Sequence, residues 1–243
     1  MMYSFILHGL GTTKLGRNDV RIQTNNIKYT LDAVELAKRL GCKKFIGAGS
    51  QAEYGRVQGV ISELTETKPD VPYGAAKLSA CHMSRILANQ IEIEHIWPRI
   101  FSSYGPYDTA QTMVTSSIRS MLEEKISPAY TKGEQTWDYI FSRDVAKAYY
   151  LIAEKGKNNS IYCIGNGQPR QLREFIEEIR NQINQDIELK LGEIEYSKNQ
   201  VMNLSVDISK LCNDTGFVPE IDFKEGIKRT INWYKNEMMQ AQE

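Results

Sequence analysis

The sequence lacks both a long hydrophobic run and an excess of either charge. Its 243 residues contain 30 basic and 30 acidic side chains, so the formal net charge is zero. A balanced surface offers no global field to attract nucleic acid or an anionic membrane, and we expect neither as a partner. The longest apolar run near the start, residues 5–7, is far shorter than the about 20 residues that cross a bilayer. With 41% hydrophobic residues the chain can still bury a core, which excludes a disordered protein.

Cysteine and histidine are also scarce, which argues against a disulfide scaffold and against a zinc site. The four cysteines form no C-x-x-C pair and lie in apolar segments: Cys42, Cys81, Cys163 and Cys212. We therefore expect free thiols and a cytoplasmic location. The three histidines are too far apart in the chain for a local zinc site: His8, His82 and His95. We assign no metal.

Short apolar runs alternate with longer segments of helical period, the pattern of an α/β fold with a parallel sheet. Strands are predicted at 3–7, 44–48, 95–101, 160–164 and 187–191. Helices are predicted at 25–40, 70–88, 112–123, 143–154, 172–183, 207–211 and 224–235. Gly41 is placed to end the first of these helices in the left-handed conformation.

Tyr73 and Lys77 carry the first chemical signal. Their i, i+4 spacing at the start of the predicted helix 70–88 places the phenol and the ammonium on one face, about one turn apart. A tyrosine has an ordinary pKa of about 10. A neighbouring cation lowers that pKa, so the pair is a candidate proton-transfer group. Taken alone, the pattern is common by chance and more often marks a packed tyrosine beside a solvated lysine.

Ser50 adds a hydroxyl to this pair. The strand 44–48 runs directly into the segment that contains Ser50, and ligands of open α/β sheets bind at the carboxyl ends of the strands. Ser50 is therefore placed to hold a substrate oxygen that Tyr73 protonates. A turn or helix-cap serine is the alternative reading.

Several further motifs share an order and spacing with one known family. They are residues 49–55 (GSQAEYG), 72–77 (PYGAAK), 98–106 (PRIFSSYGP), 133–139 (GEQTWDY) and 144–146 (DVA). With them the chain resembles the extended short-chain dehydrogenase/reductases, the NAD-dependent epimerase/dehydratase group that acts on nucleotide sugars. The resemblance covers almost the whole chain and implies a Rossmann-type sheet, NAD or NADP as cofactor, a nucleotide-sugar substrate and a possible homodimer.

The resemblance also implies roles for single residues. Tyr73 matches the catalytic acid/base, Lys77 the lysine that lowers its pKa and holds the nicotinamide ribose, and Ser50 the assisting hydroxyl. On the cofactor side, the resemblance implies Asn25 or Asn26, together with Phe101. On the substrate side it implies three positions: Ser102, Trp137 and Asn203.

Two departures from the family pattern narrow the expected chemistry. Gln51 and Ala52 occupy the positions at which family members that eliminate water have acidic residues. Glu53 is one residue further along, and we expect the alternation of an extended segment to turn its side chain to the opposite side from the catalytic residues. Dehydratase chemistry is therefore disfavoured. Trp137 and Asn203 replace the arginines that commonly grip the substrate diphosphate, and neither residue forms the bidentate fork of arginine.

The largest departure from the family pattern is in the N-terminal part of the cofactor-binding half. The glycines at 9, 11 and 16 do not have G-x-G-x-x-G spacing, and we interpret this segment as the loop after the family's fourth strand. We therefore expect an incomplete Rossmann-type sheet that lacks its first strands and its glycine-rich loop. The expected domains are residues 1–105 with 136–168 for the cofactor, and 106–135 with 169–243 as a smaller α/β substrate domain.

The leading functional hypothesis is a nucleotide-sugar 4-epimerase or 4-ketoreductase that uses NAD or NADP and Tyr73 as acid/base. The alternative is a truncated, catalytically impaired family member that serves as a binding or structural module. The sequence does not specify the sugar, the nucleotide or the choice between the two cofactors.

Overall fold

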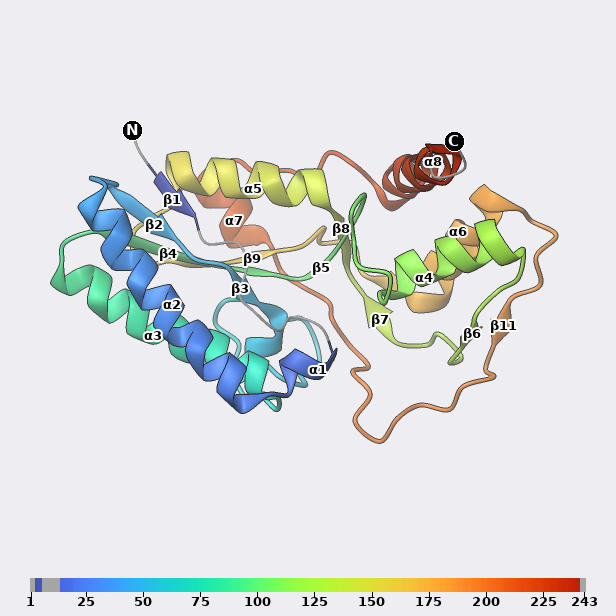
Figure 1. The fold of residues 1–243 in the computed structure, drawn as a ribbon, viewed down its shortest axis with the longest axis horizontal. Coiled ribbons are helices and arrows are strands. Elements are labelled where there is room, and N and C mark those ends of the chain that lie inside the picture. Colours follow the sequence, from blue (N-terminus) through green and yellow to red (C-terminus); the bar gives the residue numbers. More distant parts are fainter. Residues whose placement is uncertain (1–2, 6–13, 241–243) are drawn as a thin grey trace. The chain divides into compact units, whose positions relative to one another are not determined.

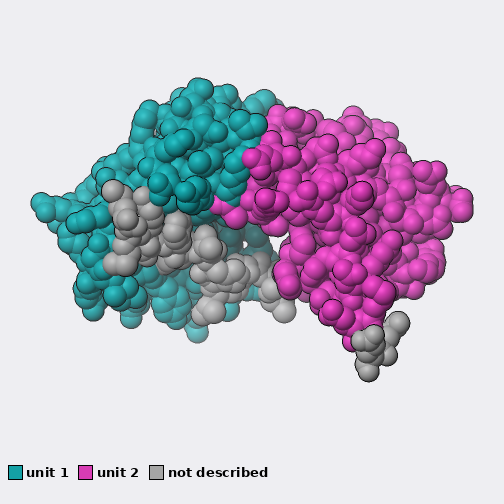
Figure 2. All heavy atoms as spheres, turned by 90° about the horizontal axis from the view of Figure 1, so that it is seen from above, with its two compact units in different colours: residues 1–101, 147–165, 206–218 teal, residues 102–146, 166–205, 219–243 magenta. Residues whose placement is uncertain are grey.

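The computed structural model describes residues 3–5 and 14–240, which divide into two compact units (Figure 2). Unit 1 takes the described parts of 1–101 with 147–165 and 206–218. Unit 2 takes 102–146, 166–205 and the described part of 219–243. These limits differ from the sequence-based domains chiefly at 136–146, which group with unit 2, and at 206–218, which group with unit 1.

A parallel sheet forms the centre of unit 1 (Figure 1). Its strand order is β1 (Tyr3–Phe5), β2 (Lys44–Ile46), β4 (Glu94–Ile100) and β3 (Gly49–Ser50), and β9 (Ile161–Ile164) also pairs with β4. Every one of these pairs is parallel. The predicted α/β class with a parallel sheet is thereby confirmed. Of the strand predicted at 3–7, residues 6 and 7 lie outside the described residues.

Helices cover both faces of this sheet (Figure 1). On one face α2 (Val20–Arg39) packs against α3 (Pro72–Gln90), and on the other lie α5 (Ser142–Lys155) and α7 (Ser209–Thr215). The core beneath the first face includes Val34 from α2, Cys81 from α3 and Trp97 from β4. Apolar side chains buried from three elements thus hold α3, which carries Tyr73 and Lys77, against the sheet.

The start of α2 differs from the prediction. The helix begins at Val20 rather than at Asn25, because the Asp19 carboxylate caps it by accepting hydrogen bonds from the backbone N–H groups of Arg21 and Ile22 at 2.9 and 3.0 Å. Its other end follows the prediction, since Gly41 has a φ of 72°.

A short helix, α1 (Lys14–Arg17), occupies the end of the segment predicted to be a loop, and residues 9–13 of that segment lie outside the described residues. The buried amide of Gln23 donates a hydrogen bond to the carbonyl of Gly16 at 2.8 Å. This bond fixes the corner between α1 and α2 and therefore the backbone that carries Arg17.

The described part of unit 2 contains three small sheets, three complete helices and the first turn of α5. The sheets are β5 (Ser102–Tyr104) with β8 (Tyr139–Phe141), β7 (Thr136–Trp137) with β10 (Arg170–Gln171), and β6 (Ala129–Tyr130) with β11 (Lys190–Leu191). The helices are α4 (Met113–Arg119), which continues as a π-helical turn at Ser120–Glu124, α6 (Leu172–Ile183) and α8 (Phe223–Gln240). They enclose an aromatic core in which Tyr104, Phe175 and Phe223 meet.

Candidate active site

Ser50 and Tyr73 meet at the carboxyl end of the sheet. Ser50 ends β3 and begins the short 3₁₀ helix η1 (Gln51–Glu53), where its Oγ accepts a hydrogen bond from the backbone N–H of Ala52 at 3.2 Å. Tyr73 lies in the first turn of α3, directly after Pro72, which occupies the first helical position where proline is favoured. A side-chain hydrogen bond with Ser50 acts to lower the pKa of Tyr73. The structure thus brings these two predicted residues together, and Ser50 is at once a helix cap and a neighbour of the phenol.

Lys77 shares this face of α3, as its spacing from Tyr73 implies. Its ammonium lies 5.8 Å from the centroid of the Tyr73 ring and donates a hydrogen bond to the carbonyl of Ala48 at 2.6 Å. Burial lowers the pKa of Lys77, while the negative charge of Glu53 acts in the opposite direction. The ammonium is therefore anchored at the end of the strand region rather than in direct contact with the phenol oxygen.

Arg17 is the site residue that the sequence did not identify. Its guanidinium lies 4.2 Å from the centroid of the Tyr73 ring, on a helix far from Tyr73 in the chain. Burial raises the pKa of Tyr73 above its ordinary value, although the hydrogen bond from Ser50 and the charge of Arg17 both act to lower that pKa. The Tyr73 pKa is therefore not lowered overall as the sequence suggested, because burial acts more strongly than the Ser50 hydrogen bond and the Arg17 charge, and Lys77 is not among the groups that shift it.

Glu53 lies in a 3₁₀ helix and not in the extended segment that the sequence suggested. Because residues 51–53 form a 3₁₀ helix rather than an extended segment, the Glu53 side chain turns into the interior and is fully buried. Its carboxylate accepts hydrogen bonds from the Ser50 backbone N–H at 2.9 Å, the Trp97 indole at 3.0 Å and Arg99 Nε at 2.7 Å. These contacts tie the Ser50 turn to the buried side chains of Trp97 and Arg99 through the Glu53 carboxylate.

Gly74 determines how closely α3 approaches this turn. A Cβ at this position would lie 2.2 Å from the carbonyl oxygen of Ala52, which is far inside van der Waals contact. The absence of a side chain therefore lets the helix that carries Tyr73 come against the segment that carries Ser50.

The predicted cofactor residues all belong to unit 1. Asn25 is exposed, whereas Asn26 is half-buried and donates a hydrogen bond from its amide to Gln23 at 3.0 Å. Of these two alternatives, only Asn26 turns towards the protein. Phe101 is buried at the end of β4, with its ring 6.2 Å from that of Tyr54.

The predicted substrate residues belong to unit 2. Trp137 is half-buried in β7, and Asn203 forms a bridge to the neighbouring Thr136, so the two positions lie side by side along the backbone. The amide oxygen of Asn203 accepts a hydrogen bond from Ser205 at 2.7 Å. Ser102 begins β5 and pairs with Tyr139.

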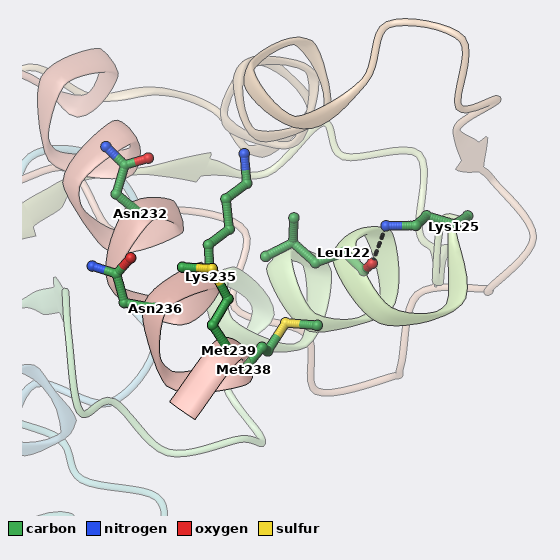
Figure 3. Close-up of a pocket in the computed structure, with 7 residues that line it drawn as sticks. All are labelled: Leu122, Lys125, Asn232, Lys235, Asn236, Met238 and Met239. Atoms are coloured by element: carbon green, nitrogen blue, oxygen red, sulfur yellow. Dashed lines mark hydrogen bonds between the residues drawn. The ribbon is translucent and has the colours of Figure 1, made fainter. Parts of the chain in front are cut away.

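A separate pocket in unit 2 shows no comparable chemistry (Figure 3). This cavity of about 590 Å³ is lined by Leu122, Lys125, Asn232, Lys235, Asn236, Met238 and Met239. Lys125 donates to the Leu122 carbonyl, as the dashed line in Figure 3 marks, and the lining contains neither a carboxylate nor a hydroxyl for proton transfer.

Within residues 3–5 and 14–240, no group of three metal-binding side chains gathers. None of the described helices has the length and apolar character needed to cross a membrane.

The fold of this chain is similar to the folds of solved structures that hold a nucleotide sugar or NADPH. A UDP-N-acetylglucosamine 4-epimerase from Methanobrevibacter ruminantium, in complex with UDP-N-acetylmuramic acid, superposes with a TM-score of 0.88 at 25% identity, over 97% of this chain and 77% of its own. The RMD protein from Pseudomonas aeruginosa, complexed with NADPH, superposes with a TM-score of 0.86 at 19% identity, over 97% of this chain and 82% of its own.

Sequence comparison defines the family. The NAD dependent epimerase/dehydratase family matches residues 9–165, and the chain belongs to this family. A dTDP-glucose 4,6-dehydratase from Escherichia coli is 29% identical over 187 residues, which cover 73% of this chain and 52% of that protein. The chain thus matches about half the length of this curated relative.

Proposed function

We propose that the protein is an NAD(P)-dependent nucleotide-sugar 4-epimerase or 4-ketoreductase. The observation that carries this proposal is the convergence of Ser50, Tyr73 and Lys77 at the carboxyl end of the parallel sheet of unit 1. Ligands of open α/β sheets bind at this end, and a phenol beside a hydroxyl and a cation is suited to exchange a proton with an alcohol.

In this mechanism Tyr73 takes the proton of the sugar 4-hydroxyl as the phenolate, or returns it as the phenol. Ser50 holds the same oxygen through its hydroxyl, which lies beside the Tyr73 side chain. A bound NAD or NADP would supply the hydride acceptor and donor for sugar C4. The protein's own part is to hold the oxygen, move its proton and keep the phenol in a low-dielectric pocket.

The residues around this cluster fit the nicotinamide ribose. An ammonium has three donors, and Ala48 takes one of those of Lys77. Lys77, with Asn26 and Phe101, would therefore hold this half of NAD or NADP. No G-x-G-x-x-G segment occurs in the sequence, so we assign no residue to the adenosine half.

We disfavour a dehydratase on the contacts of Glu53. Elimination of water needs a further acid/base group beside the tyrosine, and Gln51 and Ala52 have no ionisable side chain. Glu53, the nearest carboxylate in the chain, is buried and bonded to Trp97 and Arg99. One relative, which this chain matches over 52% of that protein's length, is named a dehydratase. That similarity does not provide the acid/base side chain that elimination needs.

For the substrate we propose a nucleotide sugar held by Ser102, Trp137 and Asn203. The nucleotide-sugar complex of the Methanobrevibacter epimerase supports this class. Trp137 offers a flat ring for stacking on a base or sugar. Without an arginine at 137 or 203, diphosphate binding is expected to depend less on bidentate salt bridges.

The test is turnover of nucleotide sugars with NAD or NADP by the full chain. We expect Tyr73→Phe to reduce kcat by about 10²–10⁴-fold, the contribution of a general acid/base. Tyr150→Phe is the matched control, because Tyr150 is 64% exposed on α5. Equal activity of the Tyr73→Phe protein and the parent would contradict the proposal.

A second candidate, a binding or structural module, is favoured by the absence of the G-x-G-x-x-G segment. Calorimetric titration separates the two functions. Binding of NAD(H) or NADP(H) at micromolar concentration supports the enzyme, whereas a folded protein without binding supports the module.

We further propose a homodimer formed through α2 and α3. These neighbouring helices expose large apolar side chains: Tyr29 at 47%, Leu36 at 51%, Met83 at 48% and Ile86 at 56%. Exposed apolar side chains gathered on adjacent helices mark an interaction surface.

All four cysteines are free thiols, which supports the proposal of a cytoplasmic location.

A further inference from the structure

Of the two cations that the structure places at the Tyr73 ring within its described residues, Arg17 lies nearer than Lys77. The guanidinium carbon of Arg17 lies 4.2 Å from the ring centroid, against 5.8 Å for the ammonium of Lys77. A guanidinium in front of an aromatic ring within about 6 Å interacts favourably with the π-system. It also places a permanent positive charge beside the phenol, since arginine is not deprotonated in proteins.

The surroundings of the two cations differ as well. The Lys77 ammonium is tied to the Ala48 carbonyl, which orients its charge towards the end of the strand region. Arg17 is half-buried, and among the residues that the structure describes no carboxylate forms an ion pair with it. A charge that is partly shielded from water and not neutralised by a salt bridge acts strongly on its neighbours.

The position of Arg17 is built into the fold. Gln23, which is 2% exposed, donates to the carbonyl of Gly16, and the backbone N–H of Asp19 donates to the same carbonyl at 3.2 Å. Two hydrogen bonds therefore hold the residue directly before Arg17. The guanidinium lies over Tyr73 from a fixed corner between α1 and α2.

We propose that Arg17 is a positioning residue of the active site, which holds the Tyr73 ring by cation–π contact and supplies the main positive charge that stabilises its phenolate. This inference rests on the proposed function of Tyr73 as acid/base. It divides two tasks that the family resemblance assigns to one lysine: Arg17 stabilises the phenolate, and Lys77 remains for the ribose.

Other charged and titratable groups also face Tyr73. Glu53 beneath it disfavours the phenolate, and Lys77 stands one turn along α3. Tyr149 on α5 also interacts electrostatically with Tyr73, and its hydroxyl donates to the carbonyl of Gly47 at 3.3 Å. Burial and the charge of Glu53 oppose the phenolate, so the phenolate depends on the nearby cations.

The experiment titrates the Tyr73 phenol without substrate or cofactor. Phenolate absorbance is recorded against pH for the full chain, and the signal of Tyr73 is isolated by subtracting the same protein with Tyr73→Phe. The series is the parent, Arg17→Gln, Arg17→Lys and Lys77→Met. Arg21→Gln is the control, since Arg21 is an exposed arginine on the adjoining turn of α2.

We expect Arg17→Gln to move the Tyr73 titration upward by about 1 pH unit or more, the size of an effect from a charge at this distance. Arg17→Lys should restore part of the shift, Lys77→Met should shift it less than Arg17→Gln, and Arg21→Gln should leave it unchanged. A titration that is the same in Arg17→Gln and the parent overturns the inference. If Arg17→Gln does not fold, Arg17→Ala takes its place, and a shift in Lys77→Met that equals or exceeds the shift in Arg17→Ala overturns the inference equally.

Activity measurements keep this inference apart from the proposed function. Where the parent turns over a nucleotide sugar, the pH profile of kcat should shift with the phenol titration. If the parent shows no turnover with any nucleotide sugar, the proposed function fails, while the titration still decides whether Arg17 controls the charge state of Tyr73.

Discussion

The carboxylate of Glu53 accepts a hydrogen bond from Arg99 Nε at 2.7 Å, and the two side chains are 0% and 2% exposed. This buried pair is also the anchor of Ser50, whose backbone N–H donates to the same carboxylate. The buried Glu53 carboxylate thus fixes the turn that carries the Ser50 hydroxyl, a proposed active-site group. The Arg99 guanidinium in turn lies 4.5 Å from the centroid of the Tyr54 ring.

Removing one partner of this pair should be costly. Arg99→Met leaves an uncompensated carboxylate in the interior, and we expect the free energy of unfolding to fall by about 3–5 kcal/mol. The matched control is Arg229→Met, because Arg229 and Glu225 form an exposed pair on α8 at 2.7 Å. That change should cost less than about 1 kcal/mol. Urea unfolding measures both, and similar losses in the two variants would show that burial does not strengthen the Glu53–Arg99 pair.

Ser50→Ala should affect both stability and catalysis. It removes a helix cap, worth about 0.5–2 kcal/mol, and a hydrogen bond to Tyr73 that we expect to be worth about 10–100-fold in kcat. Thr112→Ala is the control, because Thr112 caps α4 in unit 2 and accepts a hydrogen bond from the Thr115 backbone at 3.3 Å. It should lose similar stability with kcat unchanged. If both variants retain the parent kcat, Ser50 is a structural cap only.

His95 should make the protein less stable in mild acid. Burial and the neighbouring Arg85 lower the pKa of His95 to about 4, and its Nε2 lies 2.8 Å from Ser84 Oγ. An unfolded histidine takes up its proton near pH 6.5, so the unfolded state binds more protons than the folded state between about pH 6.5 and 4. The free energy of unfolding should fall over this window as pH falls, by about 3 kcal/mol in total.

The measurement is urea unfolding from pH 7 to pH 4 for the parent and for His95→Phe, whose curve should be flatter. Asp138 acts with the opposite sign, because burial raises its pKa to about 6 against hydrogen bonds from Asn166 and Gly167. Its contribution is present at low pH and is lost as pH rises to about 6. Both proteins contain Asp138, so its contribution cancels when one unfolding free-energy curve is subtracted from the other. Parallel curves would contradict the assignment to His95.

Ile86→Glu should abolish the proposed homodimer. Ile86 is 56% exposed on α3, and a charge there disfavours an apolar interface. Val60→Glu is the control, since Val60 is 64% exposed outside α2 and α3. Light scattering after gel filtration gives the mass of each protein, and a parent that is already monomeric would rule out this interface.

Local patterns predicted much of the fold. The helix 172–183 was found at the predicted residues, because its apolar side chains follow a strong helical period. The start of α2 was missed because Asp19, which interrupts the apolar pattern, is its cap. The helix predicted at 112–123 ends as a regular α-helix at Arg119 and continues as a π-helical turn, which the apolar pattern does not distinguish.

The candidate site shows where sequence patterns stop being informative. The placement of Tyr73 and Lys77 on one face follows from spacing within one helix. Arg17 was missed because only the tertiary fold brings α1 over α3, and no local pattern records that contact. The extended conformation expected for residues 51–53 was wrong, because these residues form a 3₁₀ helix that begins at the Ser50 cap.

The missing side chain at Gly74 limits how this site can change. Any larger residue there would have to displace the main chain of Ala52, on which the Ser50 hydroxyl depends. Redesign of the proposed specificity is therefore better directed at the proposed substrate residues of unit 2, where side chains can be exchanged without separating the serine from the tyrosine.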